Sequence, residues 1–171
     1  MVIFKCKGWL RFNMIDVAIV GAGPAGSNCA YELVKEGICA TIFDHSFPRD
    51  KPCGGLISAS MNQVFPILSK LPIIQSRISL MQVISLSNRS WTINLNEKIL
   101  GLSRLRFDQY LLGEALKEGA NLIPEKVVGI ERRSGLWKIG TTKKSYETKI
   151  LVGADGVNSV VRRKIIGVLP R

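Results

Sequence analysis

The chain has 171 residues, of which 46% are hydrophobic, and 24 Lys and Arg stand against 13 Asp and Glu, for a net charge of +11. The length and composition suit one globular domain with an ordinary core and exclude a disordered chain. The basic residues are scattered and accompany no nucleic-acid-binding motif, so we expect a solvated basic surface and no nucleic-acid partner.

The chain has four cysteines, which form no CxxC pair and have no histidine cluster beside them. They are Cys6, Cys29, Cys39 and Cys53. This spacing argues against a zinc site or a disulfide framework, so we predict no metal and a reducing, cytoplasmic setting. No apolar run approaches the roughly 20 residues that a membrane-spanning helix needs.

The first segment, MVIFKCKGWLRFN (residues 1–13), is basic and aromatic and carries no acid. It lacks the long apolar centre of a signal peptide. One interpretation is a tether to a membrane surface. The other, which we favour, is an extension ahead of a true start at Met14.

The pattern from Asp16 onward is that of a β-α-β unit with two parallel strands. Asp16–Val20 reads as a short buried strand, and Gly21–Gly26 as a turn. A helix follows to about Lys35, with Gly37 as its stop, and Cys39–Phe43 reads as the second buried strand.

The rest of the chain reads as a loop, a hairpin, a helix and several further strands. These predicted elements are, in chain order, a loop at Phe47–Gly55, a short helix within Leu56–Leu71 broken at Pro66, hairpin strands at Ile78–Leu86 and Trp91–Leu95 around Ser87–Ser90, a helix at Phe107–Lys117, and strands at Ala120–Ile123, Lys126–Arg132, Leu136–Gly140 and Lys149–Gly153.

The turn has the GxGxxG spacing of a dinucleotide site, with Pro24 and Ala25 between its second and third glycines. Gly21 permits the tight turn, Gly23 lets the backbone approach a pyrophosphate, and Gly26 lets the helix pack on the strand. The helix N-terminus presents N–H groups to phosphates. At the end of the second strand, an acid, Asp44, can accept hydrogen bonds from a ribose diol. These features predict dinucleotide binding, but the turn alone does not separate FAD from NAD.

A second acid follows the last predicted strand, in the sequence Gly-Ala-Asp-Gly at residues 153–156. Ligands of such folds bind at the carboxyl edge of the sheet, so Asp155 is a candidate acceptor for a ribitol or ribose hydroxyl. It reads equally well as a turn acid followed by Gly156.

At these residues the sequence resembles the geranylgeranyl reductase family, within the FAD-dependent oxidoreductases of the p-hydroxybenzoate hydroxylase class. The resemblance runs from about Ile15 to Arg163 and rests on four motifs. They are DVAIVGAGPAGS with Asp44, RDKPCGG (Arg49–Gly55), RLRFDQYLLGEALKEGA (Arg104–Ala120) and LVGADGVNSVVRRKI (residues 151–165).

The resemblance implies an FAD enzyme that reduces carbon–carbon double bonds in prenyl groups of isoprenoid lipids, with NAD(P)H or ferredoxin as electron donor. It places Cys53 and Gly54 by the flavin, with Cys53 as the candidate catalytic residue. It matches Arg104 to an arginine that reaches FAD and Asp108 to the acid before a helix. The FAD-binding residues it implies are Gly21, Gly23, Pro24, Ala25, Gly26, Asp44, Gly54, Gly55, Arg104, Asp155 and Gly156. A lipid substrate makes peripheral contact with a membrane an expectation as well.

The expected fold is α/β, a Rossmann-type parallel sheet with a small β-hairpin layer. We assign residues 14–171 to one FAD-binding domain, with the start of a substrate region at about 78–100. Family members are roughly twice as long, so the C-terminal half of the family fold has no counterpart here. Two other interpretations stay open: an aromatic monooxygenase of the same fold, and a non-catalytic FAD-binding fragment or half of a split enzyme that needs a complementing C-terminal chain.

Overall fold

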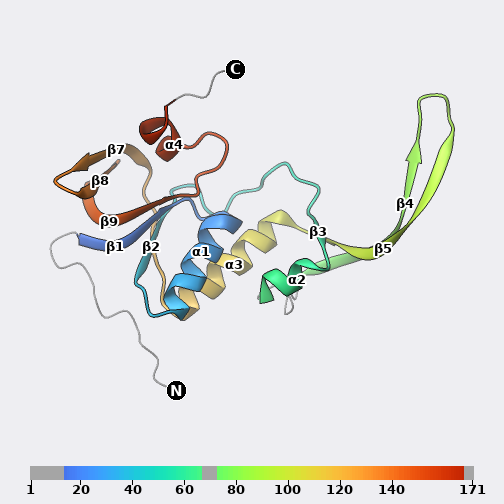
Figure 1. The fold of residues 1–171 in the computed structure, drawn as a ribbon, viewed down its shortest axis with the longest axis horizontal. Coiled ribbons are helices and arrows are strands. Elements are labelled where there is room, and N and C mark those ends of the chain that lie inside the picture. The colour runs from blue at the N-terminus through green and yellow to red at the C-terminus, as the bar shows by residue number, and fades with distance from the viewer. Residues whose placement is uncertain (1–13, 67–72, 168–171) are drawn as a thin grey trace. The chain divides into compact units, whose positions relative to one another are not determined.

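The computed structural model describes residues 14–66 and 73–167 of the chain (Figure 1). The predicted N-terminal extension, residues 1–13, lies outside the described residues. The chain divides into two compact units, one formed by the segments before Asp50 and after Phe107, the other by Asp50–Phe107. The assignment of one FAD-binding domain to residues 14–171 stays a prediction.

The first unit contains a six-stranded sheet in the order β6-β2-β1-β9-β8-β7. Its strands are β1 (Met14–Val20), β2 (Ala40–Phe43), β6 (Asn121–Ile123), β7 (Val127–Arg133), β8 (Leu136–Thr141) and β9 (Ser145–Gly153). β6, β2, β1 and β9 are parallel, as predicted, whereas β8 runs antiparallel to both of its neighbours, β9 and β7.

The predicted Rossmann-type sheet is thus confirmed, with the antiparallel hairpin of β7 and β8 added at one edge. The two strands pair in this way because their connection is short. Only Ser134 and Gly135 separate β7 from β8, and both have positive φ, 50° and 83°. Two residues of this conformation form a hairpin turn, whereas a parallel crossover needs a dozen residues or more.

The predicted β-α-β unit is confirmed. Helix α1 spans Pro24–Lys35 and ends where Gly37 takes a φ of +77°. There the N–H of Ile38 donates to the carbonyl of Leu33 at 2.9 Å, which satisfies one of the last helical carbonyls. Gly37 thus stops the helix as the sequence predicts.

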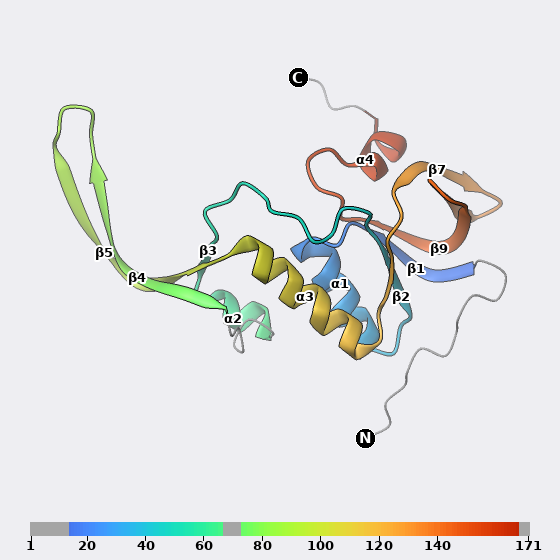
Figure 2. The same cartoon turned by 180° about the vertical axis from the view of Figure 1, so that it is seen from behind.

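Two apolar clusters hold this unit together. One joins α1 to β1, β2 and the later part of α3 (Arg104–Glu118) through buried side chains that include Ile19, Ile42 and Leu112. Figure 2 shows α1 and α3 side by side. In the other cluster the rings of Phe43 and Tyr146 meet edge to face, 5.0 Å apart, with Val161 of helix α4 (Val160–Ile165) beside them. The sequence did not predict α4.

The second unit contains a three-stranded antiparallel sheet in the order β3-β5-β4, formed by β3 (Leu56–Ser58), β4 (Ile74–Ile84) and β5 (Ser90–Leu102). The predicted hairpin is confirmed, with longer strands. Of the helix predicted within Leu56–Leu71, the described part is the four-residue α2 (Met61–Val64), and β3 occupies the start of that segment. None of the helices in residues 14–66 and 73–167 is long and apolar enough to cross a membrane.

Candidate functional site

Three segments converge where strands β1, β2 and β9 end. The N–H of Gly21 donates to the carbonyl of Phe43 at 2.8 Å, and that of Ala154 to Val20 at 2.8 Å. The chain passes from β1 to β2 on one side of β1 and returns later as β9 on the other side. In open α/β sheets, ligands bind at the carboxyl edge where the strand order diverges in this way. The predicted glycine turn, Asp44 and Asp155 all lie at this edge.

Two of the three motif glycines are required by the packing of the chain on itself. Gly21 has a φ of +106°, and a Cβ there would overlap the carbonyl of Ala154. A Cβ on Gly26 would overlap the carbonyl oxygen of Gly21. These contacts confirm a tight turn and close packing of helix on strand.

Gly23 is different, because its backbone conformation does not demand glycine. It is the N-cap of α1, with φ −71° and ψ −178°, an extended conformation open to any residue. Close approach of another group to the backbone would explain why glycine occupies this position, as a pyrophosphate approaches it in dinucleotide sites.

The N-terminus of α1 has neither a side-chain cap nor an acid in its first turn, and Pro24 begins the helix. The N–H of Ser27 is bonded to the carbonyl of Gly23 at 2.9 Å, and its hydroxyl donates to the carbonyl of Ala22 at 3.0 Å. The first turn of α1 therefore holds no acid that would offset the helix dipole, which suits an anionic ligand.

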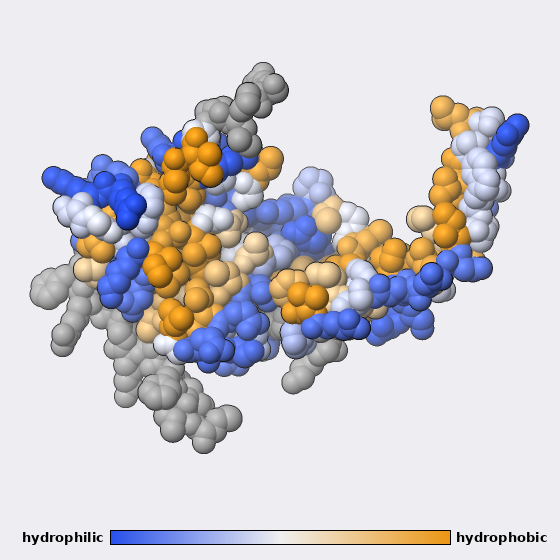
Figure 3. Space-filling model, in the orientation of Figure 1, coloured by the Kyte–Doolittle hydropathy of each residue, from blue (hydrophilic) through white to orange (hydrophobic). Residues whose placement is uncertain are grey.

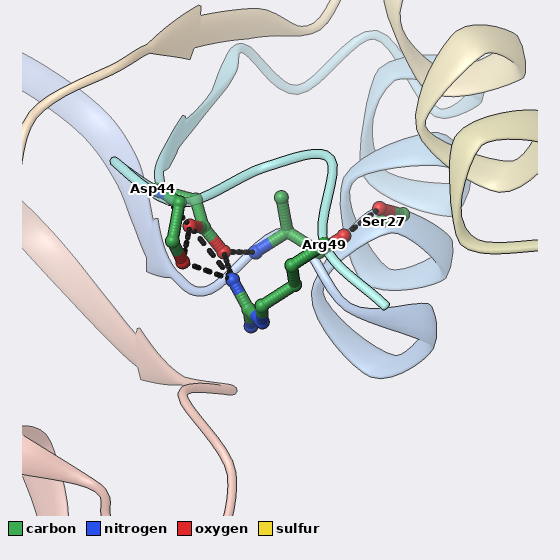
Figure 4. A network of polar contacts seen from close by, with 5 residues as sticks. Ser27, Asp44 and Arg49 are labelled. Atoms are coloured by element: carbon green, nitrogen blue, oxygen red, sulfur yellow. Dashed lines mark hydrogen bonds and ion pairs between the residues drawn. The ribbon is translucent and has the colours of Figure 1, made fainter. Parts of the chain in front are cut away.

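Asp44 is the centre of a buried polar network that ties the end of β2 to the glycine turn (Figure 4). Its carboxylate accepts the N–H of Ala22 and the N–H of Ser46, each at 2.9 Å, and the Ser46 hydroxyl at 3.0 Å. Nη1 of Arg49 lies 2.9 and 3.0 Å from its two oxygens. Burial raises the pKa of Asp44, but the hydrogen bonds from Ala22 and Ser46 and the Arg49 guanidinium together outweigh it, so the pKa lies below its ordinary value.

Both carboxylate oxygens of Asp44 are thus engaged within the protein. A carboxylate offers about four lone-pair positions, and these donors occupy them. A ribose diol that binds Asp44 must take the place of one of them, and a candidate is Arg49, whose side chain is 30% exposed. The sequence analysis did not predict that Arg49 contacts Asp44; the available signal was a cation five residues after the strand-end acid.

Asp155 has a local structural role as well. Its carboxylate accepts hydrogen bonds from the Ser159 hydroxyl and from the backbone N–H groups of Val160, at 2.6 Å, and Val161, at 3.3 Å. These bonds satisfy the start of α4, in line with the alternative reading as a turn acid. Gly156 next to it has a φ of +77°. The assignment of Asp155 to a flavin hydroxyl stays a prediction.

The other predicted site residues lie in the Asp50–Phe107 unit. The N–H of Leu102 donates to the carbonyl of Gly55 at 2.9 Å, and Gly55 has a φ of +64° with no room for a Cβ against Leu102. The N–H of Gly55 also donates to Sγ of Cys53 at 3.5 Å, and Cys53 is exposed. The loop that carries Cys53 and Gly54 is thus anchored to the end of β5, and Arg104 is the first residue of α3. Their roles toward a flavin stay predictions.

Comparison with known proteins agrees with this geometry. A family described as an NAD(P)-binding Rossmann-like domain matches residues 19–64. Geranylgeranyl diphosphate reductase of Rhodobacter capsulatus is 32% identical over 157 residues, which cover 88% of this chain and 39% of the enzyme. An uncharacterised protein encoded in the nifH2 5′ region of Methanosarcina barkeri is 33% identical over 164 residues, 86% of each chain.

Solved structures show the same fold. A geranylgeranyl bacteriochlorophyll reductase-like protein from Thermoplasma acidophilum superposes with a TM-score of 0.71 at 23% identity, over 84% of this chain and 40% of that one. A halogenase solved in complex with phloroglucinol and FAD gives a TM-score of 0.70 at 19% identity, over 87% of this chain and 36% of that one.

The chain spans about two-fifths of the length of the named reductases that it matches, 39% for the Rhodobacter enzyme. Sequence identity, the Rossmann-like match and the shared fold agree with one another. The chain is therefore homologous to the N-terminal portion of geranylgeranyl reductases, and it shares the fold of FAD-dependent oxidoreductases.

Proposed function

We propose that this chain is the FAD-binding part of a reductase that saturates carbon–carbon double bonds in the prenyl groups of isoprenoid lipids. The observation that carries the proposal is the glycine turn at the ends of β1, β2 and β9, which leaves the N-terminus of α1 uncapped. The enzymes with the same sequence pattern at about 30% identity are named as geranylgeranyl diphosphate reductases.

The described residues fit the adenosine and pyrophosphate end of FAD. Gly23, Pro24 and Ala25 place the backbone and the α1 N-terminus next to the pyrophosphate. Asp44 would accept hydrogen bonds from the adenosine ribose if Arg49 left its carboxylate. The freed guanidinium would then be available to pair with the anionic part of the ligand.

The flavin end of the site is assigned by the family resemblance. Asp155 and Gly156 lie at the sheet edge and would contact the ribityl chain, and the resemblance assigns Arg104, Gly54 and Gly55 to FAD binding as well. Cys53 would face the ring, where its thiol can donate a proton or shape the pocket. When bound and reduced, FAD supplies hydride chemistry, and the protein's part is to position the alkene and exclude water.

The proposed substrate is a prenyl lipid or prenyl diphosphate, and the proposed electron donor is NAD(P)H or ferredoxin. The net charge of +11 supports an anionic substrate or transient contact with an anionic lipid surface. A prenyl diphosphate combines both chemistries that the proposal needs, an alkene and a negative headgroup.

The test incubates the protein with geranylgeranyl diphosphate and FAD and then analyses the products. Dithionite serves as the reductant in place of the unidentified electron donor. Each reduced double bond adds two hydrogens, about 2 Da by mass spectrometry, and Gly23→Trp should abolish the product because it fills the approach to the backbone. Reduction that survives Gly23→Trp would contradict the site. Oxygen-dependent hydroxylation of an aromatic in place of prenyl reduction would favour a monooxygenase. Flavin binding without either reaction would favour a non-catalytic half.

A further inference from the structure

The carboxylate of Asp44 is covered by the side chain of Arg49. Only 4% of the Asp44 side chain is exposed, against 30% for Arg49. Nη1 of Arg49 contacts both carboxylate oxygens, at 2.9 and 3.0 Å, and also donates to the Ser46 hydroxyl (Figure 4). A ligand therefore reaches this carboxylate only after a group that contacts it has moved.

The four donors on Asp44 are of two kinds. Two are backbone N–H groups, those of Ala22 in the glycine turn and of Ser46. They are fixed by the path of the chain, and Ala22 is completely buried. The other two are the Ser46 hydroxyl, at 3.0 Å, and the Arg49 guanidinium. These two belong to side chains of the loop after β2, so rotation about side-chain bonds is enough to remove them.

The two side-chain donors match a ribose diol in number but not in charge. A vicinal diol also offers two O–H donors to one carboxylate, so it can take the positions of both. The diol is neutral, however, and a guanidinium stabilises a buried carboxylate more strongly than a hydroxyl does. The side chains of Ser46 and Arg49 therefore compete with a ribose for Asp44, and they are hard to displace.

We propose that Arg49 and Ser46 form a latch on the ribose subsite, and that FAD binds to this chain only in the conformation in which the latch has left Asp44. The proposal rests on the proposed function, since it requires that the adenosine ribose bind Asp44, and it adds a regulation of that site. The latched form is the major conformation, because it keeps the buried carboxylate paired with a cation. A released form that is populated at about 10% or less slows association by roughly tenfold or more.

The latch predicts an effect on binding kinetics that a simple ligand role of Arg49 does not. If Arg49 only contacted the bound cofactor, its removal would speed dissociation and would leave the association rate constant unchanged or lower. If Arg49 holds the subsite closed, its removal raises the association rate constant. The association and dissociation rate constants therefore distinguish a latch from a binding contact.

The test is stopped-flow mixing of the purified 171-residue chain with FAD, with flavin fluorescence as the signal. Arg49→Met removes the guanidinium and keeps a long side chain, and its association rate constant should rise at least roughly tenfold. Arg49→Lys keeps a positive charge but lacks the planar fork of donors, so its rate constant should fall between those of Arg49→Met and the unmodified chain. Circular dichroism checks that each variant is folded, and Arg49→Lys carries the test if Arg49→Met does not fold.

The matched control is Arg133→Met. Arg133 is exposed at the end of β7, and this substitution removes the same charge by the same change of side chain. Its association rate constant should match that of the unmodified chain, because Arg133 is not among the donors to Asp44.

Equal or slower association of FAD with the folded Arg49 variants would overturn the latch, and so would an equal acceleration by Arg133→Met. Saturable FAD binding in either case would leave the proposed function in place. If neither the unmodified chain nor the folded variants bound FAD, the ribose subsite and the latch would both be overturned.

Discussion

The six-stranded sheet and the β4–β5 hairpin are built from equally good strand sequences, yet they differ in what covers them. In the sheet, Ile19 and Ile42 are completely buried by α1, α3 and neighbouring strands. In the hairpin, Leu100 and Leu102 are buried near the base, whereas Val83 and Trp91 further out stay about half exposed.

This difference shows that a strand pattern specifies pairing, and that burial depends on a second layer. The helices that cover the sheet come from the same 171 residues. The glycine turn therefore stands on a scaffold whose packing partners are present, whereas the outer hairpin lacks a cover among the described residues. The glycine turn and the outer hairpin thus differ in how completely the described residues pack around them, and apolar side chains are gathered along one side of the hairpin (Figure 3).

The largest expected effect comes from shortening one isoleucine to alanine in the six-stranded sheet, and the same change in the hairpin serves as the comparison. Ile19→Ala removes a fully buried side chain and should lower the free energy of unfolding by about 2–5 kcal/mol. Ile93→Ala, at a side chain that is 42% exposed, should change it by less than about 1 kcal/mol in the 171-residue chain. Urea unfolding followed by circular dichroism measures both, and equal losses would contradict the contrast.

A second comparison uses glycines in two helices. Gly26→Ala should destabilise the chain by about 1–3 kcal/mol and weaken FAD binding, because the new Cβ overlaps the carbonyl of Gly21. Gly113→Ala in α3, with open space around it, should stabilise the chain by about 0.5–1 kcal/mol. The two melting temperatures should therefore move in opposite directions, and a neutral Gly26→Ala would refute the close packing of the turn.

The third comparison concerns acid-dependent stability. Because the folded-state pKa of Asp44 lies below its ordinary value of 3.8, its ionised form stabilises the fold fully above that value. This contribution is lost as the pH falls from about 4 toward the lower, folded-state pKa. Asp44→Asn should lower stability at neutral pH by about 1–3 kcal/mol and flatten the curve below about pH 4.

The matched control is Asp16→Asn, for which we expect the smallest change in stability. Asp16 forms an ion pair with Lys149 at 3.2 Å, but both side chains are more than half exposed. Such pairs contribute between about 0 and 1 kcal/mol. Thermal unfolding between pH 2 and pH 7 compares the two variants. If Asp16→Asn changed the pH dependence of stability as much as Asp44→Asn does, Asp44 would have no special role in acid-dependent stability.

Much of the fold around the site was predictable because local signals there agree. The glycine spacing, the buried strands and the stop at Gly37 all indicate one β-α-β unit, and the positive φ values of Gly21 and Gly37 explain why glycine is needed. The hairpin follows from a polar turn between two apolar strands. These features depend on residues close together in the chain.

The features that were missed depend on tertiary context. Strand β3 has three residues and exists because it pairs with Ile99–Gly101 of β5, far along the sequence. Helix α4 has six residues, and its first N–H groups are bonded to the N-cap Ser159 and to Asp155. The Arg49–Asp44 contact requires the loop after β2 to fold back on its own strand end, which composition alone does not specify.

The central claim, that the glycine turn forms a flavin-nucleotide site on this chain, is tested most directly by equilibrium titration of FAD with the purified 171-residue protein, followed by flavin fluorescence. The account predicts saturable binding that Gly23→Trp abolishes while the circular dichroism spectrum stays unchanged. A folded chain that shows no saturable binding, or one that binds FAD equally well with Trp at position 23, would contradict it.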